Sequence, residues 1–120
     1  SKLMQYAFTV AKKVRTETAI GQTPVSVAYA AVRLARQIHG DLKPKTALLI
    51  GAGDTISLVA NHLRGQHIGR MIIANRTLSR SEELARELGG EPIALTDLAQ
   101  HLWEADIVVS STASPLPIIN

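Results

Sequence analysis

Residues 46–55 read TALLIGAGDT, and they decide the fold because an apolar run here breaks into two glycines and then into polar residues. A run of four to eight apolar residues that ends at glycine is typical of a strand buried on both faces, as in a parallel sheet. Gly51 and Gly53 supply the φ freedom and the bare backbone that a dinucleotide pyrophosphate needs at a helix N-terminus. The stretch therefore predicts a strand, a phosphate-binding turn and the first turn of a helix.

Strand and helix patterns alternate after this stretch. Alternation of this kind implies right-handed crossovers and a parallel sheet. We therefore expect an α/β fold, a Rossmann-type doubly wound parallel sheet truncated at about four strands and preceded by an N-terminal helical arm. Ser79 with Glu82 resembles a capping box, Gly89 is a helix-ending glycine, and Thr96 is placed to cap the next helix. The expected elements are strands at 46–50, 70–74, 92–94 and 106–110 and helices at 54–65, 79–88 and 97–103.

The residues before the sheet differ in composition from those that form it. Residues 1–45 carry eight Lys and Arg against two acidic residues, a charge of +6, whereas residues 46–120 carry five Arg against eight acids, a charge of −3. Amphipathic patterns predict two helices in the first part, the second at about 26–39, and the connection at 41–45 contains Pro44. We expect a helical arm at 1–45 and a nucleotide-binding domain at 46–120. A basic arm could contact nucleic acid through phosphates, but a solvated helix face is the simpler alternative.

The glycine turn matches the dinucleotide fingerprint only in part. Gly51 permits the sharp turn and Gly53 permits close approach of the pyrophosphate, but Ile56 stands where the third glycine lets helix and strand pack closely. Ala60, one turn further on, could supply part of that closeness. A strand before the turn and a helix after it favour dinucleotide binding over a purely structural turn.

The end of the second strand indicates which dinucleotide is bound. Domains that select NAD place Asp or Glu here to bind the ribose 2′-hydroxyl, whereas this strand ends in Asn75, Arg76 and Thr77. Arg76 can pair with a 2′-phosphate through a charge-assisted hydrogen bond. We therefore expect NADPH as the cofactor. An ordinary surface arginine before a helix is the alternative.

Polar residues also follow the fourth strand. Ser110, Ser111 and Thr112 should lie beside the glycine turn, because the first and fourth strands flank the switch point at which ligands bind. Their hydroxyls and backbone could line the ribose or nicotinamide side of the cofactor. A polar strand end that leads into a turn is an equally good account of them.

Neither a catalytic residue nor a metal site is predicted. The chain has no cysteine, and its four histidines do not share a face or an element. Asp54 and Asp106 are assigned to a first helical turn and a strand start, not to catalysis. No run approaches the roughly 20 apolar residues of a membrane span, so we expect a soluble, cytoplasmic protein.

Five stretches together resemble glutamyl-tRNA reductase, and they cover nearly the whole chain. The glycine turn and the ANRT sequence are shared with other NADP reductases such as shikimate dehydrogenase, but VRTET and the alanine-rich helix that follows it are not. The stretches are VRTET at 14–18, SVAYAAVRLARQI at 26–38, LLIGAGDTISLVANHL at 48–63, IIANRTLSRSEELA at 72–85 and ADIVVSSTASPLPII at 105–119.

The resemblance implies an enzyme of tetrapyrrole (porphyrin) biosynthesis that reduces glutamyl-tRNA(Glu) to glutamate 1-semialdehyde with NADPH. The nucleophilic cysteine of that family would lie outside this chain, so we expect a fragment that binds cofactor without catalysing. A C-terminal domain would form a homodimer, and glutamate-1-semialdehyde aminomutase is an implied partner. The alternatives are a shikimate-dehydrogenase-like reductase and a non-enzymatic nucleotide-sensing or tRNA-binding module. The implied cofactor residues are Gly51, Ala52, Gly53, Asp54, Thr55 and Ile56 at the pyrophosphate, Asn75, Arg76 and Thr77 at the adenosine phosphate, and Ser110, Ser111, Thr112 and Ala113 at the nicotinamide.

Overall fold

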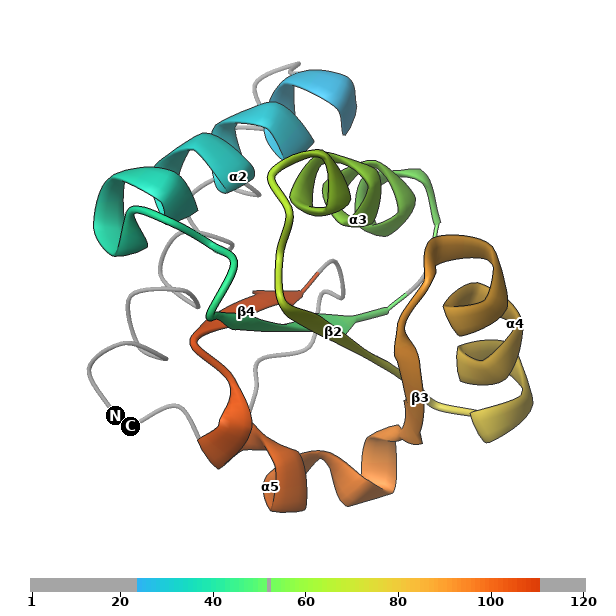
Figure 1. Ribbon diagram of the computed structural model, residues 1–120. Coiled ribbons are helices and arrows are strands. Elements are labelled where there is room, and N and C mark those ends of the chain that lie inside the picture. The colour runs from blue at the N-terminus through green and yellow to red at the C-terminus, as the bar shows by residue number, and fades with distance from the viewer. Residues whose placement is uncertain (1–23, 52, 111–120) are drawn as a thin grey trace.

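A computed structural model describes residues 24–51 and 53–110 (Figure 1). Helices and strands alternate through the described part of the chain, as the sequence predicts. In chain order the elements are α2 (Pro24–His39), β1 (Thr46–Ile50), α3 (Asp54–Gly65), β2 (Arg70–Asn75), α4 (Leu78–Leu88), β3 (Glu91–Ala94), the 3-10 segment η1 (Leu95–Asp97), α5 (Leu98–His101), the 3-10 segment η2 (Leu102–Glu104) and β4 (Ile107–Ser110).

The four strands form one parallel sheet in the order β3-β2-β1-β4. This order reverses direction between β1 and β4, as at the switch point of a doubly wound sheet. In the register of the central strands, Ile50 pairs with Ala74 on one side and with Ser110 on the other. The predicted fold class is confirmed, and the ends of β1, β2 and β4 lie along one edge of the sheet.

The core is built around β1, as its apolar sequence requires. Ala47, Leu48, Leu49 and Ile50 are at most 1% exposed because helices cover both faces of the sheet. Figure 1 shows α2 and α3 over one face and α5 under the other. No helix in residues 24–51 and 53–110 is long and apolar enough to cross a membrane.

Helix α2 packs on α3 and shares the core of the sheet. Ala28, Val32 and Ala35 lie on one face of α2 and belong to the same apolar cluster as the strands. Their small side chains allow the two helices to approach closely. The predicted division of the chain at residue 45 stays a prediction, and the first of the two helices predicted in the arm lies outside the described residues.

Two of the predicted helix caps are wrong. Helix α4 begins at Leu78 after Thr77, whose extended backbone (φ −114°, ψ 136°) makes it the N-cap, so Ser79 already lies inside the helix and forms no capping box. Thr96 lies in η1, and the helix expected at 97–103 is only the single α-turn α5 between two 3-10 segments. The glycine stop is confirmed, because Gly89 has left-handed backbone angles (φ 80°, ψ 46°) and its N–H bonds Ala85 O at 2.8 Å.

Candidate nucleotide-binding site

The turn after β1 depends on two glycines with positive φ. Gly51 is buried with φ 114°, and its N–H donates to the carbonyl of Ala74 at 3.0 Å, which fastens the turn to the end of β2. Gly53 has φ 96° and ψ −173°, a backbone region that is essentially restricted to glycine. Gly53 is exposed, and a Cβ built on it meets no heavy atom within 4 Å. A ligand can therefore approach the backbone of the turn directly.

Helix α3 begins at this turn with backbone donors available to a ligand. Gly53 is its N-cap and has no side chain to cap the helix, and no described side chain accepts from the first N–H groups of the helix, which lack intrahelical partners. Asp54 is exposed and Thr55 half-buried in this first turn. Such amides and the positive end of the helix dipole favour an anion.

Ile56, which occupies the position of the third glycine, points into the core. Its side chain is 0% exposed and packs in the same apolar cluster as Val59, and Ala60 is also 0% exposed. Helix and strand thus pack through an isoleucine rather than through a bare backbone. The side chain is not part of the surface of the turn, so only the backbone of Ile56 can contribute to a ligand site there.

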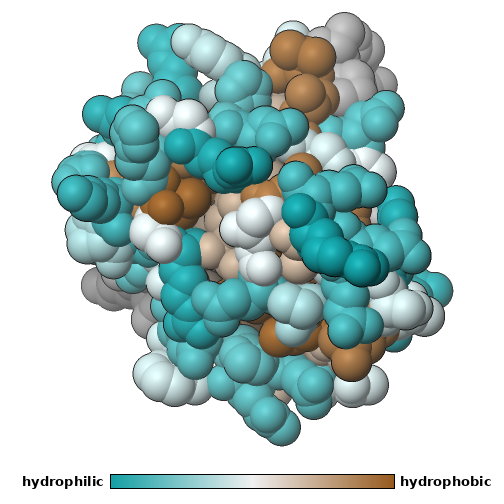
Figure 2. All heavy atoms as spheres, turned by 45° about the vertical axis from the view of Figure 1, so that its right-hand side comes forward, coloured by the Kyte–Doolittle hydropathy of each residue, from teal (hydrophilic) through white to brown (hydrophobic). Residues whose placement is uncertain are grey.

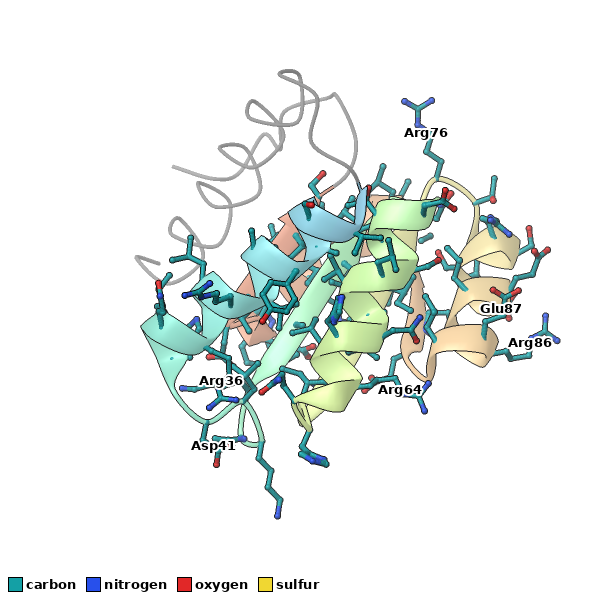
Figure 3. All side chains as sticks on the ribbon, turned by 90° about the horizontal axis from the view of Figure 1, so that it is seen from above. Arg36, Asp41, Arg64, Arg76, Arg86 and Glu87 are labelled. Atoms are coloured by element: carbon teal, nitrogen blue, oxygen red, sulfur yellow. The ribbon has the colours of Figure 1, made fainter. Side chains whose placement is uncertain are left out.

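The residues after β2 lie at the same edge of the sheet. Asn75 ends the strand half-buried, whereas Arg76 and Thr77 are exposed in the connection to α4. Figure 3 shows the Arg76 side chain extending away from the body of the protein at this end. Within the described residues, Arg76 forms no ion pair with a carboxylate. Its guanidinium is therefore available to an anionic ligand.

The end of β4 completes the edge on the other side of β1. Ser110 pairs in register with Ile50, the residue before Gly51, and it is only 4% exposed. Strands β1 and β4 therefore flank the switch point as predicted. Ala52 and the three residues Ser111, Thr112 and Ala113 lie outside the described part of the chain.

At the opposite edge, where the strands begin, the structure places an ionic cluster that sequence reasoning missed. The Arg70 guanidinium bonds both carboxylate oxygens of Glu91, at 2.6 and 2.8 Å, and lies 3.4 Å from Glu104 Oε2, which is itself 3.2 Å from His101 Nδ1. The hydrogen bond from Arg70 holds the pKa of Glu91 below its ordinary value. Arg70 and Glu91 begin adjacent parallel strands, a signal that could have paired them once the strand order was known.

Two open hollows also lie at this opposite edge, away from the glycine turn. One is lined by residues around the starts of β2 and β3 together with Lys43, Arg64 and His67. The other lies beside it between the end of α2 and the turn after α3, and it shares Lys43 and His67. Within 24–51 and 53–110, no three His, Cys, Asp or Glu side chains cluster in a way that could hold a metal ion.

A parallel sheet in the order β3-β2-β1-β4, with a glycine turn and a helix N-terminus at its switch point, defines a Rossmann-type nucleotide-binding domain. Comparison with known families agrees with this class. The sequence pattern of the family described as shikimate / quinate 5-dehydrogenase matches residues 33–120, so the chain belongs to that family.

Individual relatives confirm the resemblance to glutamyl-tRNA reductase. The chain is 58% identical over 117 residues to the glutamyl-tRNA reductase of Hydrogenovibrio crunogenus and 61% identical over 117 residues to that of Saccharophagus degradans, covering 98% of this chain in both cases. The solved glutamyl-tRNA reductase of Methanopyrus kandleri is 43% identical and superposes with a TM-score of 0.69 over 89% of this chain. The chain spans about a quarter of these proteins, 27%, 28% and 27% of their lengths.

Proposed function

We propose that the chain is the NADPH-binding domain of a glutamyl-tRNA reductase, the oxidoreductase that reduces glutamyl-tRNA(Glu) to glutamate 1-semialdehyde in tetrapyrrole biosynthesis. One observation carries the cofactor part of the proposal. The glycine turn, the α3 N-terminus and Arg76, which forms no ion pair with any described residue, lie at the same edge of the sheet. The identity of 58–61% to proteins of that name over 98% of this chain supports the choice of enzyme.

The residues at this edge fit the parts of NADPH in turn. The backbone of Gly51–Ile56 would hold the pyrophosphate, since glycines expose the backbone amides. The space beside Gly53 is open, because a Cβ placed there would meet no heavy atom within 4 Å. Residues 75–77 would hold the adenosine 2′-phosphate through Arg76, and residues 110–113 would line the nicotinamide side. When bound, NADPH supplies the hydride, and this chain supplies binding and orientation.

The reacting carbonyl and the nucleophilic cysteine belong to other parts of the proposed enzyme, because this chain has no cysteine. The other proposed partners follow from the same assignment. They are glutamyl-tRNA(Glu) as the substrate, a second subunit bound through a C-terminal dimerisation domain, and glutamate-1-semialdehyde aminomutase as the acceptor of the product. The proposed location is the cytoplasm.

Replacement of Arg76 by alanine tests the cofactor assignment. A hydrogen bond to a charged group contributes about 1.5–3 kcal/mol, so Arg76→Ala should raise the Kd for NADPH by about tenfold to a hundredfold. The Kd for NADH should change little, because NADH lacks the 2′-phosphate. Calorimetric titration of both cofactors measures the two values. Arg86→Ala, an exposed arginine in the last turn of α4, is the matched control and should change neither Kd.

Equal losses for NADPH and NADH in the Arg76→Ala protein would contradict the 2′-phosphate assignment. A shikimate-dehydrogenase-like reductase is the second candidate, because the matching family pattern carries that description. Assay of the full-length protein separates the two candidates. NADPH-dependent reduction of glutamyl-tRNA(Glu) supports the first, and NADP-dependent oxidation of shikimate supports the second.

A further inference from the structure

The edge of the sheet opposite the glycine turn carries a group of basic side chains that the cofactor does not use. We name it the basic edge and define it by Arg36, Lys43, Arg64 and His67, which line the two neighbouring hollows. Nucleotides bind outside the carboxyl ends of parallel strands, whereas these residues lie where the strands begin. Figure 3 shows Arg36 and Arg64 at one end of the protein and Arg76 at the other.

The four residues come from separate segments that meet around the turn after α3. Arg36 lies in the last turn of α2, Lys43 in the α2–β1 connection and Arg64 in the last turn of α3. The Arg36 guanidinium donates to the side-chain oxygen of Gln66, which fixes it beside that turn. His67 has φ 60°, an uncommon left-handed conformation for a residue other than glycine, and its N–H bonds Arg64 O at 2.9 Å.

Charge at the basic edge is poorly neutralised. Within the described part of the chain, Arg36, Lys43 and Arg64 form no ion pair, although the neighbouring Arg70 is held by Glu91 and Glu104. Two acidic residues line the hollows: Asp41, whose carboxylate accepts the backbone N–H of Lys43 at 3.0 Å, and Glu91, which is already paired with Arg70. Among the described residues, three arginine and lysine side chains therefore face solvent, and Asp41 is the only carboxylate lining the hollows that is not held by Arg70.

We propose that the basic edge binds the phosphate backbone of an RNA, which on the proposed function is the tRNA portion of the substrate. Several basic side chains over an open surface suit a chain of phosphates better than a single small anion. No Phe, Tyr or Trp side chain lines either hollow within the described residues, and His67 is the only ring there, so the contact is made mainly with phosphates rather than with stacked bases. The RNA would lie away from the cofactor edge and leave it open.

A matched pair of double variants of the full-length protein tests this proposal. The test variant is Arg36→Gln with Arg64→Gln, and the control is Arg33→Gln with Arg86→Gln. Each pair takes one exposed arginine from α2 and one from the last turn of another helix, so both variants lose the same charge. Figure 3 shows Arg86 on the outer side of α4, away from Arg36. The measurement is the Kd for a tRNA(Glu) transcript at several salt concentrations.

The test variant should bind tRNA about tenfold more weakly at 0.15 M salt, and its log–log salt slope should fall by about 2, one for each lost phosphate contact. A transcript of another tRNA should lose affinity equally, since phosphates carry no sequence. The control should keep the Kd and the slope of the wild type. An unchanged test variant, or equal losses in test and control, overturns the proposal.

NADPH titration of the same proteins separates this proposal from the proposed function. Wild type, test and control should bind NADPH equally, which also verifies that each is folded. If the test variant fails to bind NADPH, Lys43→Gln replaces it, since the side chain of Lys43 is exposed in a loop. Absence of NADPH binding by the wild type would refute the cofactor assignment, and it would leave the comparison of tRNA affinities to decide the basic edge alone.

Discussion

Ile56 allows the core and the cofactor turn to be tested separately by one substitution. Ile56→Ala removes three buried carbon atoms, and about 0.8 kcal/mol for each gives about 2.4 kcal/mol of lost transfer free energy. The residual cavity adds to this loss, whereas the higher helix propensity of alanine offsets a few tenths of a kcal/mol. Because the side chain is fully buried, we expect the free energy of unfolding to fall by about 2–4 kcal/mol.

The assay for Ile56→Ala has two readouts. Urea unfolding measures the lost stability, and a titration well below the melting temperature measures the Kd for NADPH. The Kd should stay within about twofold of wild type, since the backbone amides of the turn are unchanged. Such a change is far below the tenfold that corresponds to about 1.4 kcal/mol. Ile56→Val, which removes one methyl group, should cost only about 0.5–1.5 kcal/mol. A Kd raised tenfold with unchanged stability would refute the placement of Ile56 in the core.

Two further predictions concern the edge at which the strands begin. Gly69→Ala should destabilise the protein by about 1–3 kcal/mol in urea unfolding, because the added Cβ would overlap the carbonyl oxygen of Lys43. Gly65→Ala, at a helix end where a Cβ meets nothing within 4 Å, should be neutral or stabilising, and equal losses would contradict the contact. The hydrogen bond from Arg70 lowers the pKa of Glu91 in the folded state, so the ionised carboxylate stabilises folding above its unfolded pKa, and this contribution is lost as pH falls through the folded pKa. The stability difference between wild type and Glu91→Gln should therefore shrink from pH 7 to pH 3, and a difference that does not vary with pH would rule out the pairing.

Local sequence patterns were sufficient to predict the strands of the sheet and most of the helices that cover it. The predicted strand at 46–50 and the predicted helix at 54–65 match β1 and α3, because a doubly buried strand and a glycine turn have strong sequence patterns. The helix predicted at 97–103 is α-helical only at Leu98–His101, although Leu98 and Leu102, one turn apart, are both buried as the pattern predicts. Its remaining residues adopt 3-10 geometry, which a periodicity of apolar residues does not distinguish.

The positions of the candidate site residues at the strand ends were predictable from the sequence, but the burial of their side chains was not. Spacing placed Gly51, Arg76 and Ser110 at the ends of strands, and the register of the sheet brings those ends together. That Ile56 faces the core could not be derived from the fingerprint, because the fingerprint describes the glycine that is missing. Hydrogen bonds such as that from Gly51 N–H to Ala74 O depend on the pairing of two strands, which local sequence does not specify.

The distribution of charge in space differs from its distribution along the sequence. A count along the chain divides it at residue 45 into a basic part of +6 and an acidic part of −3. Arg64 belongs to the acidic part, yet the turn after α3 places it beside Lys43 of the basic part. Meanwhile Arg70, another basic residue of the acidic part, is paired with Glu91 and Glu104. Which cations are available to a polyanion is therefore decided by the fold at the strand starts, and a linear charge count cannot identify them.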